Sequence, residues 1–228
     1  MTNFVRFRDR VEAGRMLANA LRDYVNRQDV LILALPRGGV PVAYEVAKDL
    51  DAPLDIFLVR KLGVPGGEEL AMGAIASGGV KVLNEEVIKM EGISDREIES
   101  VYAKEQEELK RRELAYRGNA APPQIRDKTV ILVDDGIATG STMRAAVTAL
   151  RRQRPSKLIV AVPTAPRSSC AALRLVADEV VTVMTPEPFF AVSQSYEIFG
   201  QTSDEEVREL FERSKRRLKG SDDHSSSD

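Results

Sequence analysis

Two adjacent aspartates, Asp134 and Asp135, follow a run of four apolar residues and precede a loop of small residues. The apolar run, residues 130–133, has the composition of a strand that is buried on both faces. Two neighbouring carboxylates repel each other unless a ligand brings hydroxyl groups, a metal ion or a developing positive charge between them. The pair is therefore a candidate site for a ligand such as a ribose phosphate, which carries a diol.

The loop that follows, GIATGST over residues 136–142, has the composition of a phosphate-binding turn at the start of a helix. Free main-chain N–H groups and the positive end of the helix dipole attract anions there, and three hydroxyl side chains add donors. Walker-type loops need a lysine that is missing after Gly140, and dinucleotide-binding loops need a glycine spacing that Gly136 and Gly140 do not give. The loop predicts a monophosphate site; the alternative is an ordinary turn with acids near a helix start.

A second candidate turn, Pro36-Arg37-Gly38-Gly39, follows an earlier apolar run. Its glycines let the backbone approach a ligand closely, and Arg37 supplies a cation. Lys61 lies near the end of the next apolar run. Because ligands bind at the carboxyl ends of parallel strands, we expect these groups to converge on one anion. The alternatives are a plain turn at residues 37–39 and a solvated strand end at Lys61.

The thirteen residues VILVDDGIATGST (130–142) resemble the motif with which type I phosphoribosyltransferases bind 5-phosphoribosyl 1-pyrophosphate (PRPP). The resemblance implies that Asp134 and Asp135 hold the ribose 2- and 3-hydroxyls. It also implies Mg²⁺, to which these two aspartates contribute directly or through water. The implied 5-phosphate contacts are Ala138, Thr139, Gly140, Ser141 and Thr142, and the implied pyrophosphate contacts are Arg37, Gly38, Gly39 and Lys61.

Three further segments, residues 7–21, 68–79 and 188–207, resemble a branch of bacterial and archaeal phosphoribosyltransferases whose acceptor is not established. Ser195 stands where that branch often has an aromatic residue, so the resemblance does not extend to acceptor stacking at this position. The candidates for an acceptor platform are the aromatic residues Phe189, Phe190 and Tyr196. Their alternative role is packing in the core.

Transfer from PRPP breaks a bond between C1 and oxygen and leaves an oxocarbenium-like sugar. Positioning and charge stabilisation supply the catalysis, so no histidine is needed. We therefore predict a Mg²⁺-dependent phosphoribosyltransferase that moves the phosphoribosyl group to a nucleobase-like acceptor, of purine or pyrimidine type, and releases pyrophosphate, as in nucleobase salvage. The alternatives are a PRPP- or nucleotide-binding regulator without transferase activity and a phosphatase-like hydrolase.

Alternating apolar strands and amphipathic helices predict a doubly wound α/β fold with a mainly parallel sheet and flanking helices. The expected strands are 29–36, 54–62, 129–135, 157–165 and 179–186, and the expected helices are 8–26, 40–49, 142–152, 168–177 and 203–219. Two short strands within 71–86 turn at Gly78-Gly79, and a helix capped by Ser94 and Glu97 runs to Tyr116.

We expect one domain over residues 1–219, with a core at about 28–186, a helical insertion at about 87–118 and an acceptor-side segment at 187–219. Residues 220–228, GSDDHSSSD, form an expected disordered acidic tail. The single histidine, His224, lies in that tail, which argues against a histidine-dependent nucleophile system or a His-ligated zinc site.

The composition of the 228-residue chain, with 43% hydrophobic and 30% charged residues, is that of an ordinary globular protein. A single cysteine, Cys170, excludes an internal disulfide and agrees with a reducing compartment. A net charge of -2 gives no basic field for nucleic acid, and no apolar run approaches the ~18 residues of a membrane span. We expect a cytoplasmic protein without nucleic-acid or membrane partners; a homodimer is compatible with the sequence.

Overall fold

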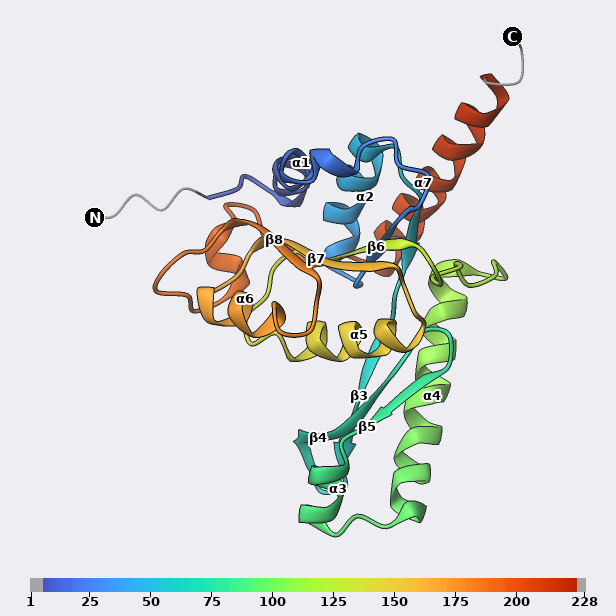
Figure 1. The fold of residues 1–228 in the computed structure, drawn as a ribbon, viewed down its shortest axis with the longest axis vertical. Coiled ribbons are helices and arrows are strands. Elements are labelled where there is room, and N and C mark those ends of the chain that lie inside the picture. Colours follow the sequence, from blue (N-terminus) through green and yellow to red (C-terminus); the bar gives the residue numbers. More distant parts are fainter. Residues whose placement is uncertain (1–5, 225–228) are drawn as a thin grey trace.

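The computed structural model describes residues 6–224, apart from the side chains of residues 68–69 and 219–224. Its centre is a five-stranded sheet in the order β2-β1-β6-β7-β8, and all four neighbouring pairs are parallel. This sheet confirms the predicted doubly wound α/β fold (Figure 1). The strands are β1 (Val30–Ala34), β2 (Leu54–Ile56), β6 (Thr129–Val133), β7 (Lys157–Thr164) and β8 (Glu179–Met184).

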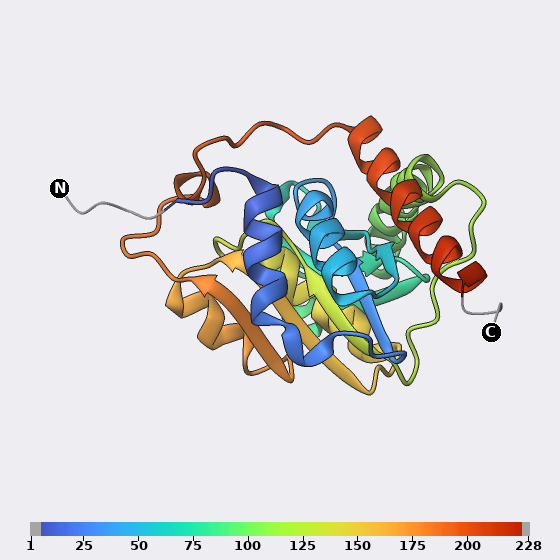
Figure 2. The same cartoon turned by 90° about the horizontal axis from the view of Figure 1, so that it is seen from above.

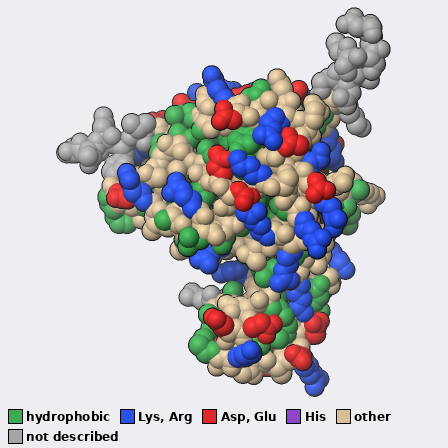
Figure 3. Space-filling view, viewed as in Figure 1, with side chains coloured by type: hydrophobic (Ala, Val, Ile, Leu, Met, Phe, Trp, Pro, Cys, Tyr) green, Lys and Arg blue, Asp and Glu red, His purple; other side chains and the backbone are tan. Residues whose placement is uncertain are grey.

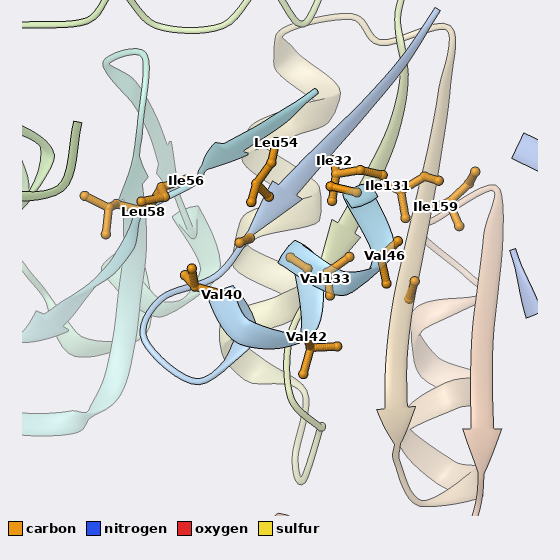
Figure 4. Packing of buried hydrophobic residues seen from close by; sticks show 14 of the residues in the cluster. Ile32, Val40, Val42, Val46, Leu54, Ile56, Leu58, Ile131, Val133 and Ile159 are labelled. Carbon is orange, nitrogen blue, oxygen red and sulfur yellow. The ribbon is translucent and has the colours of Figure 1, made fainter. Parts of the chain in front are cut away.

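Helices cover both faces of this sheet (Figures 1 and 2). One layer contains α1 (Arg10–Ala20), α2 (Gly39–Leu50) and α7 (Asp204–His224), and the other contains α5 (Ser141–Arg152) and α6 (Arg167–Leu173). Successive strand residues point to opposite faces, so Ile131 packs under the first layer and Leu132 under the second. Figure 4 shows the first of these contacts, with side chains from the strands and from α2 meeting in one apolar cluster.

A separate antiparallel sheet projects from the main body and corrects the strand expected at 54–62. Leu54–Ile56 joins the central sheet as β2, whereas Val59–Val64 forms β3 and pairs with β4 (Gly67–Ala76). The chain changes sheets at Phe57, whose N–H still bonds to Ala34, and Leu58, whose N–H bonds to Ser77 Oγ at 3.0 Å. The residues at the junction, Ile56 to Val59, are all apolar, so periodicity alone could not show the change of partner.

The remaining elements of this projection are β5 (Val80–Leu83), α3 (Glu85–Glu91) and α4 (Asp95–Arg117). The turn at Gly78-Gly79 and the Ser94–Glu97 capping box are present as predicted. A separate helix α3, capped by Asn84, comes before α4. Ion pairs tie α4 to the small sheet through Arg60–Glu105 and to β2 through Arg117–Asp55.

The segment before α1 lies beside the segment that follows β8, at the carboxyl side of the sheet (Figure 2). Phe7 forms a parallel bridge with Tyr196, in the segment between β8 and α7 that also contains the 3-10 turn η2 (Val192–Ser195). The opening helix expected at 8–26 is shorter: α1 ends at Ala20, and the 3-10 turn η1 (Arg22–Tyr24) follows.

The last helix is longer than predicted. The tail expected to begin at residue 220 continues α7 to His224, because extending an existing helix through residues without proline costs little; residues 225–228 lie outside the described part. None of the helices within residues 6–224 has the length and apolarity that a bilayer crossing requires. Figure 3 shows acidic and basic side chains interspersed over one face of the molecule.

Candidate functional site

The two aspartates at the end of β6 face different neighbours. Asp134 lines a small hollow of about 200 Å³ together with residues 136–143, and its Oδ1 accepts the N–H of Asp135 at 2.8 Å. The Asp135 carboxylate instead meets Arg10: Nε and Nη2 of the guanidinium each lie 2.8 Å from Oδ2. The adjacent acids are therefore not equivalent.

Their surroundings shift both acids in the same direction. Burial raises the pKa of Asp134 well above its ordinary range, and the neighbouring charge of Asp135 adds to this effect. Burial also raises the pKa of Asp135, although the Arg10 guanidinium opposes that rise. Asp134 is thus a carboxylate whose charge is poorly compensated, and a ligand hydroxyl or a cation beside it would be stabilising.

The loop at 136–142 is held closely against its neighbours. A Cβ on Gly136 would lie 2.5 Å from Val192 Cγ1 and 2.9 Å from Thr164 Cγ2, so only glycine fits there. Ser169 Oγ on α6 donates to the Ala138 carbonyl at 2.6 Å. Gly140 has a φ of 76°, which turns the chain into α5 and leaves the first N–H groups of that helix without intrahelical partners. The implied phosphate contacts all line the 200 Å³ hollow: Ala138, Thr139, Gly140, Ser141 and Thr142.

The turn after β1 packs directly on the aspartates. A Cβ on Gly39 would stand 2.8 Å from Asp134 Cα, and one on Gly38 would stand 2.0 Å from Asp135 Oδ2. The Pro36–Arg37 peptide bond in this turn is cis. Arg37 is nearly half exposed, and its Nη1 lies 3.7 Å from Asp204 Oδ1. The structure therefore brings together the two turns that the sequence singled out.

Lys61 reaches the same region from an unexpected element. It lies within β3 of the small sheet, not at the end of a strand of the central sheet. With Thr142 it lines a hollow of about 550 Å³ between the small sheet and α4. Lys104 on α4 lines this hollow as well. No sequence signal pointed to Lys104, because it is one of many charged residues on a solvated helix.

The aromatic candidates divide into two groups. Tyr196 is 3% exposed, with ring centroids 5.4 Å from Phe7 and 5.0 Å from Phe199. Its hydroxyl donates to the Asp135 main-chain oxygen at 2.5 Å, and burial raises its pKa. Both the ring and the hydroxyl of Tyr196 are engaged in these contacts, which gives it less support as an acceptor platform than the exposed Phe190; its role there stays a prediction. Phe190 is 82% exposed and Phe189 is partly buried, so both keep their predicted role as candidates.

Arg10 is a second residue of this site that sequence reasoning missed. It lies in the first turn of α1 and contacts an aspartate 125 residues further along the chain. The pattern around it indicates only an amphipathic helix, because nothing local shows which partner a surface arginine will find.

The aspartates also fit the Mg²⁺ that the sequence implied. Magnesium prefers hard oxygen donors and commonly uses one or two carboxylates, with water and substrate phosphates completing its shell. Among the side chains that the structure describes, residues 6–67 and 70–218, no group of three or more His, Cys, Asp or Glu is placed to hold a metal ion. The raised pKa of Asp134 marks a buried charge that a divalent cation would compensate.

Comparisons with known proteins agree with this geometry. The model of the phosphoribosyl transferase domain matches residues 8–197. A curated Mycobacterium tuberculosis protein, whose name describes a phosphoribosyl transferase, is 45% identical over 210 residues, which are 92% of this chain and 47% of that protein. The chain thus spans about half the length of the curated relatives it matches. A ribose-phosphate pyrophosphokinase of Methanopyrus kandleri is 36% identical over 105 residues, 43% of this chain and 36% of that enzyme.

Among solved structures, the crystal structure of TT1426 from Thermus thermophilus superimposes with a TM-score of 0.81 at 39% identity. The match covers 91% of this chain and 98% of the Thermus chain. The match of the domain model spans the whole central sheet and includes Arg10, both turns and the acid pair. The chain belongs to the phosphoribosyl transferase family.

Proposed function

We propose that the chain transfers the 5-phosphoribosyl group of PRPP to a nucleobase-like nitrogen acceptor and releases pyrophosphate. The observation that carries this proposal is the packing of Gly38 and Gly39 against Asp135 and Asp134, beside the hollow of the 136–143 loop. This contact brings the turn at residues 36–39, the acid pair and the 136–142 loop next to one another, which supports the binding of one ligand by all three. Family membership supports the same function.

Each part of PRPP has a suitable partner. The first turn of α5 offers main-chain N–H groups to the 5-phosphate, with the Thr139 and Ser141 hydroxyls beside them. The carboxylate of Asp134 suits the ribose diol, because an ionised acid accepts two hydroxyl hydrogen bonds. Arg37 and Lys61 are cations for the pyrophosphate, and Arg37 can bind two phosphate oxygens at once.

The proposed reaction needs no protein nucleophile. The bond between C1 and the pyrophosphate oxygen breaks, its electron pair leaves with pyrophosphate, and the acceptor nitrogen forms the new bond to C1. Positive charge develops on the sugar as this happens, and we assign its stabilisation to the carboxylates of Asp134 and Asp135. Mg²⁺, when bound by these aspartates and PRPP oxygens, supplies positive charge to the departing pyrophosphate.

The acceptor side is proposed for the segment that follows β8. Val192 of this segment contacts the site at Gly136, where a Cβ would lie 2.5 Å from Val192 Cγ1. Phe190 is open to solvent in the same segment and can stack on a base, with Phe189 next to it. We propose a purine- or pyrimidine-type base as the acceptor.

The test is release of pyrophosphate in the presence of PRPP, Mg²⁺ and a panel of purine and pyrimidine bases. The proposal predicts release that depends on one base and that is lost when Asp134 and Asp135 are both replaced by Asn. Binding of PRPP without release across the panel would favour a regulator that kept the pocket. Phosphate release without any acceptor would favour a hydrolase.

A further inference from the structure

Arg10 makes a set of contacts that reaches beyond an ordinary surface ion pair. Its Nε and Nη2 both lie 2.8 Å from Asp135 Oδ2, and its Nη1 donates to the Gly200 carbonyl at 2.7 Å. The guanidinium carbon lies 4.1 Å from the centre of the Phe199 ring, within the range of a cation–π contact. The Arg10 side chain is only 13% exposed. Each of the three guanidinium nitrogens therefore has a partner.

The same aspartate is held from its main chain. The Tyr196 hydroxyl donates to the Asp135 carbonyl at 2.5 Å, and the Tyr196 ring packs between Phe7 and Phe199. Main-chain hydrogen bonds join the segment before α1 to the segment that contains Tyr196. The Phe7 N–H donates to the Ser195 carbonyl at 2.9 Å, and the Glu197 N–H donates to the Phe7 carbonyl at 2.8 Å. The pairing of these segments places Arg10 and Tyr196 in contact with the same residue, Asp135.

These contacts fix the orientation of the Asp135 carboxylate. Both guanidinium contacts use Oδ2, so Oδ1 is the carboxylate oxygen that Arg10 does not hold. Gly38 closes the other side of Oδ2. A carboxylate this buried and next to Asp134 would be costly without a cation. Lysine could not replace the contact fully, because an ammonium lacks the planar fork that reaches Asp135 and Gly200 together.

We propose that Arg10 is a positioning residue of the PRPP site, which fixes the orientation of the Asp135 carboxylate so that Oδ1 is turned toward the ligand. Phe199 and the pairing of the segments around Phe7 and Tyr196 keep the guanidinium in place. The inference rests on the proposed function, because it assigns Asp135 a contact with the sugar. It makes the affinity for PRPP depend on residues before α1 and after β8, outside the two candidate ligand-binding turns.

The experiment is calorimetric titration of the full chain with PRPP in the presence of Mg²⁺, with circular dichroism as the measure of folding. Arg10→Gln should weaken PRPP binding by about tenfold, and Arg10→Lys should restore part of the loss. Arg15→Gln is the matched control, because Arg15 lies on the same helix and pairs with Glu45, away from the site. It should bind PRPP like the wild type.

The decisive measurement is whether the effect of Arg10→Gln on PRPP affinity depends on Asp135. In an Asp135→Asn background, Arg10→Gln should weaken binding no further, whereas a merely structural arginine would cost the same in both backgrounds. If Arg10→Gln does not fold, Phe199→Leu replaces it, because this variant removes the stacked ring and keeps the arginine. It should weaken PRPP binding a fewfold, again only when Asp135 is present.

The outcomes separate this inference from the function on which it rests. If the wild type binds PRPP and Arg10→Gln binds it equally well, the positioning role alone is overturned. An equal loss from Arg10→Gln in the wild-type background and in the Asp135→Asn background would also overturn it. A wild-type chain that does not bind PRPP would overturn the proposed function and this inference with it.

Discussion

Gly38 faces the Asp135 carboxylate so closely that a Cβ at position 38 would lie 2.0 Å from Oδ2 and 2.6 Å from Cγ. This contact joins the turn after β1 to the end of β6, and no L side chain can enter it. Because Arg10 fixes the same Oδ2, the carboxylate cannot simply move aside. The two candidate ligand-binding turns therefore form one rigid unit, and a change in either should affect the other.

The first prediction concerns Gly38→Ala. The added methyl group must displace Asp135 or the turn, so we expect a loss of about 1–3 kcal/mol in the free energy of unfolding. We also expect PRPP affinity to fall by about tenfold or more, because the acid pair moves. Urea unfolding and calorimetry measure these changes. Gly67→Ala is the control, since a Cβ there meets nothing within 4 Å; equal effects of the two variants would contradict the interlocking of the turns.

The second prediction concerns the pH dependence that Asp134 causes. Because burial raises its pKa in the folded chain, ionising Asp134 costs more in the folded than in the unfolded state. Its contribution to stability is therefore lost as the pH rises through the unfolded-state and then the folded-state pKa. Asp134→Asn lacks this cost, so we expect a higher Tm than wild type at about pH 8 and no gain below about pH 3, where both states are protonated.

Asp134→Asn should lose affinity for PRPP while it gains stability. Asn cannot accept both ribose hydroxyls as a carboxylate does, so PRPP affinity should fall about ten- to hundredfold. Thermal melts in metal-free buffer and PRPP titrations with Mg²⁺ give the two halves of the result. A variant that is less stable than wild type at about pH 8, or that binds PRPP normally, would show that Asp134 has been assigned wrongly.

The third prediction concerns the phosphate loop. Thr139→Val keeps the size of an exposed side chain in the hollow but removes its hydroxyl. We expect affinity for ribose 5-phosphate to fall by about tenfold, the usual effect of losing one hydrogen bond to a charged group. Thr148→Val is the control, because Thr148 lies further along α5 and its hydroxyl donates to the Arg144 carbonyl. Equal affinities in all three proteins would remove Thr139 from the site.

The fourth prediction concerns Lys61. Its side chain lines the 550 Å³ hollow beside Thr142, where the ammonium would meet pyrophosphate. Lys61→Ala should weaken the inhibition of PRPP turnover by added pyrophosphate about three- to tenfold. It should leave the Tm nearly unchanged, since exposed charges contribute little to stability. Lys110→Ala, on the exposed surface of α4, should change neither quantity. If the Lys61 and Lys110 variants behaved alike, Lys61 would have no role in binding pyrophosphate, and only the turn at Arg37 would remain as its proposed site.

Local patterns were enough to predict the part of the site that lies on consecutive residues. The strand, the acid pair and the loop over residues 130–142 occupy one βα unit, and the edge rule for parallel sheets brings the turn at Arg37 to the same place. The capping box at Ser94 was predictable for the same reason, because Ser94 and Glu97 interact within one helical turn.

Long-range contacts decided the rest. An apolar run cannot show that the chain leaves one sheet at Phe57 and enters another at Val59. The charged N-terminal segment gave no sign that Arg10 would reach Asp135, and aromatic character alone did not distinguish the packed Tyr196 from the exposed Phe190. These features depend on tertiary packing, which overrides local preference.

A crystal structure of the chain soaked with PRPP and Mg²⁺ would decide whether the two turns and the acid pair bind this ligand together. We expect the 5-phosphate within hydrogen-bond distance of the main-chain N–H groups of residues 138–142, with the ribose hydroxyls on Asp134 and on Oδ1 of Asp135. Density for PRPP at another place, with the 138–142 turn empty, would refute the proposed site.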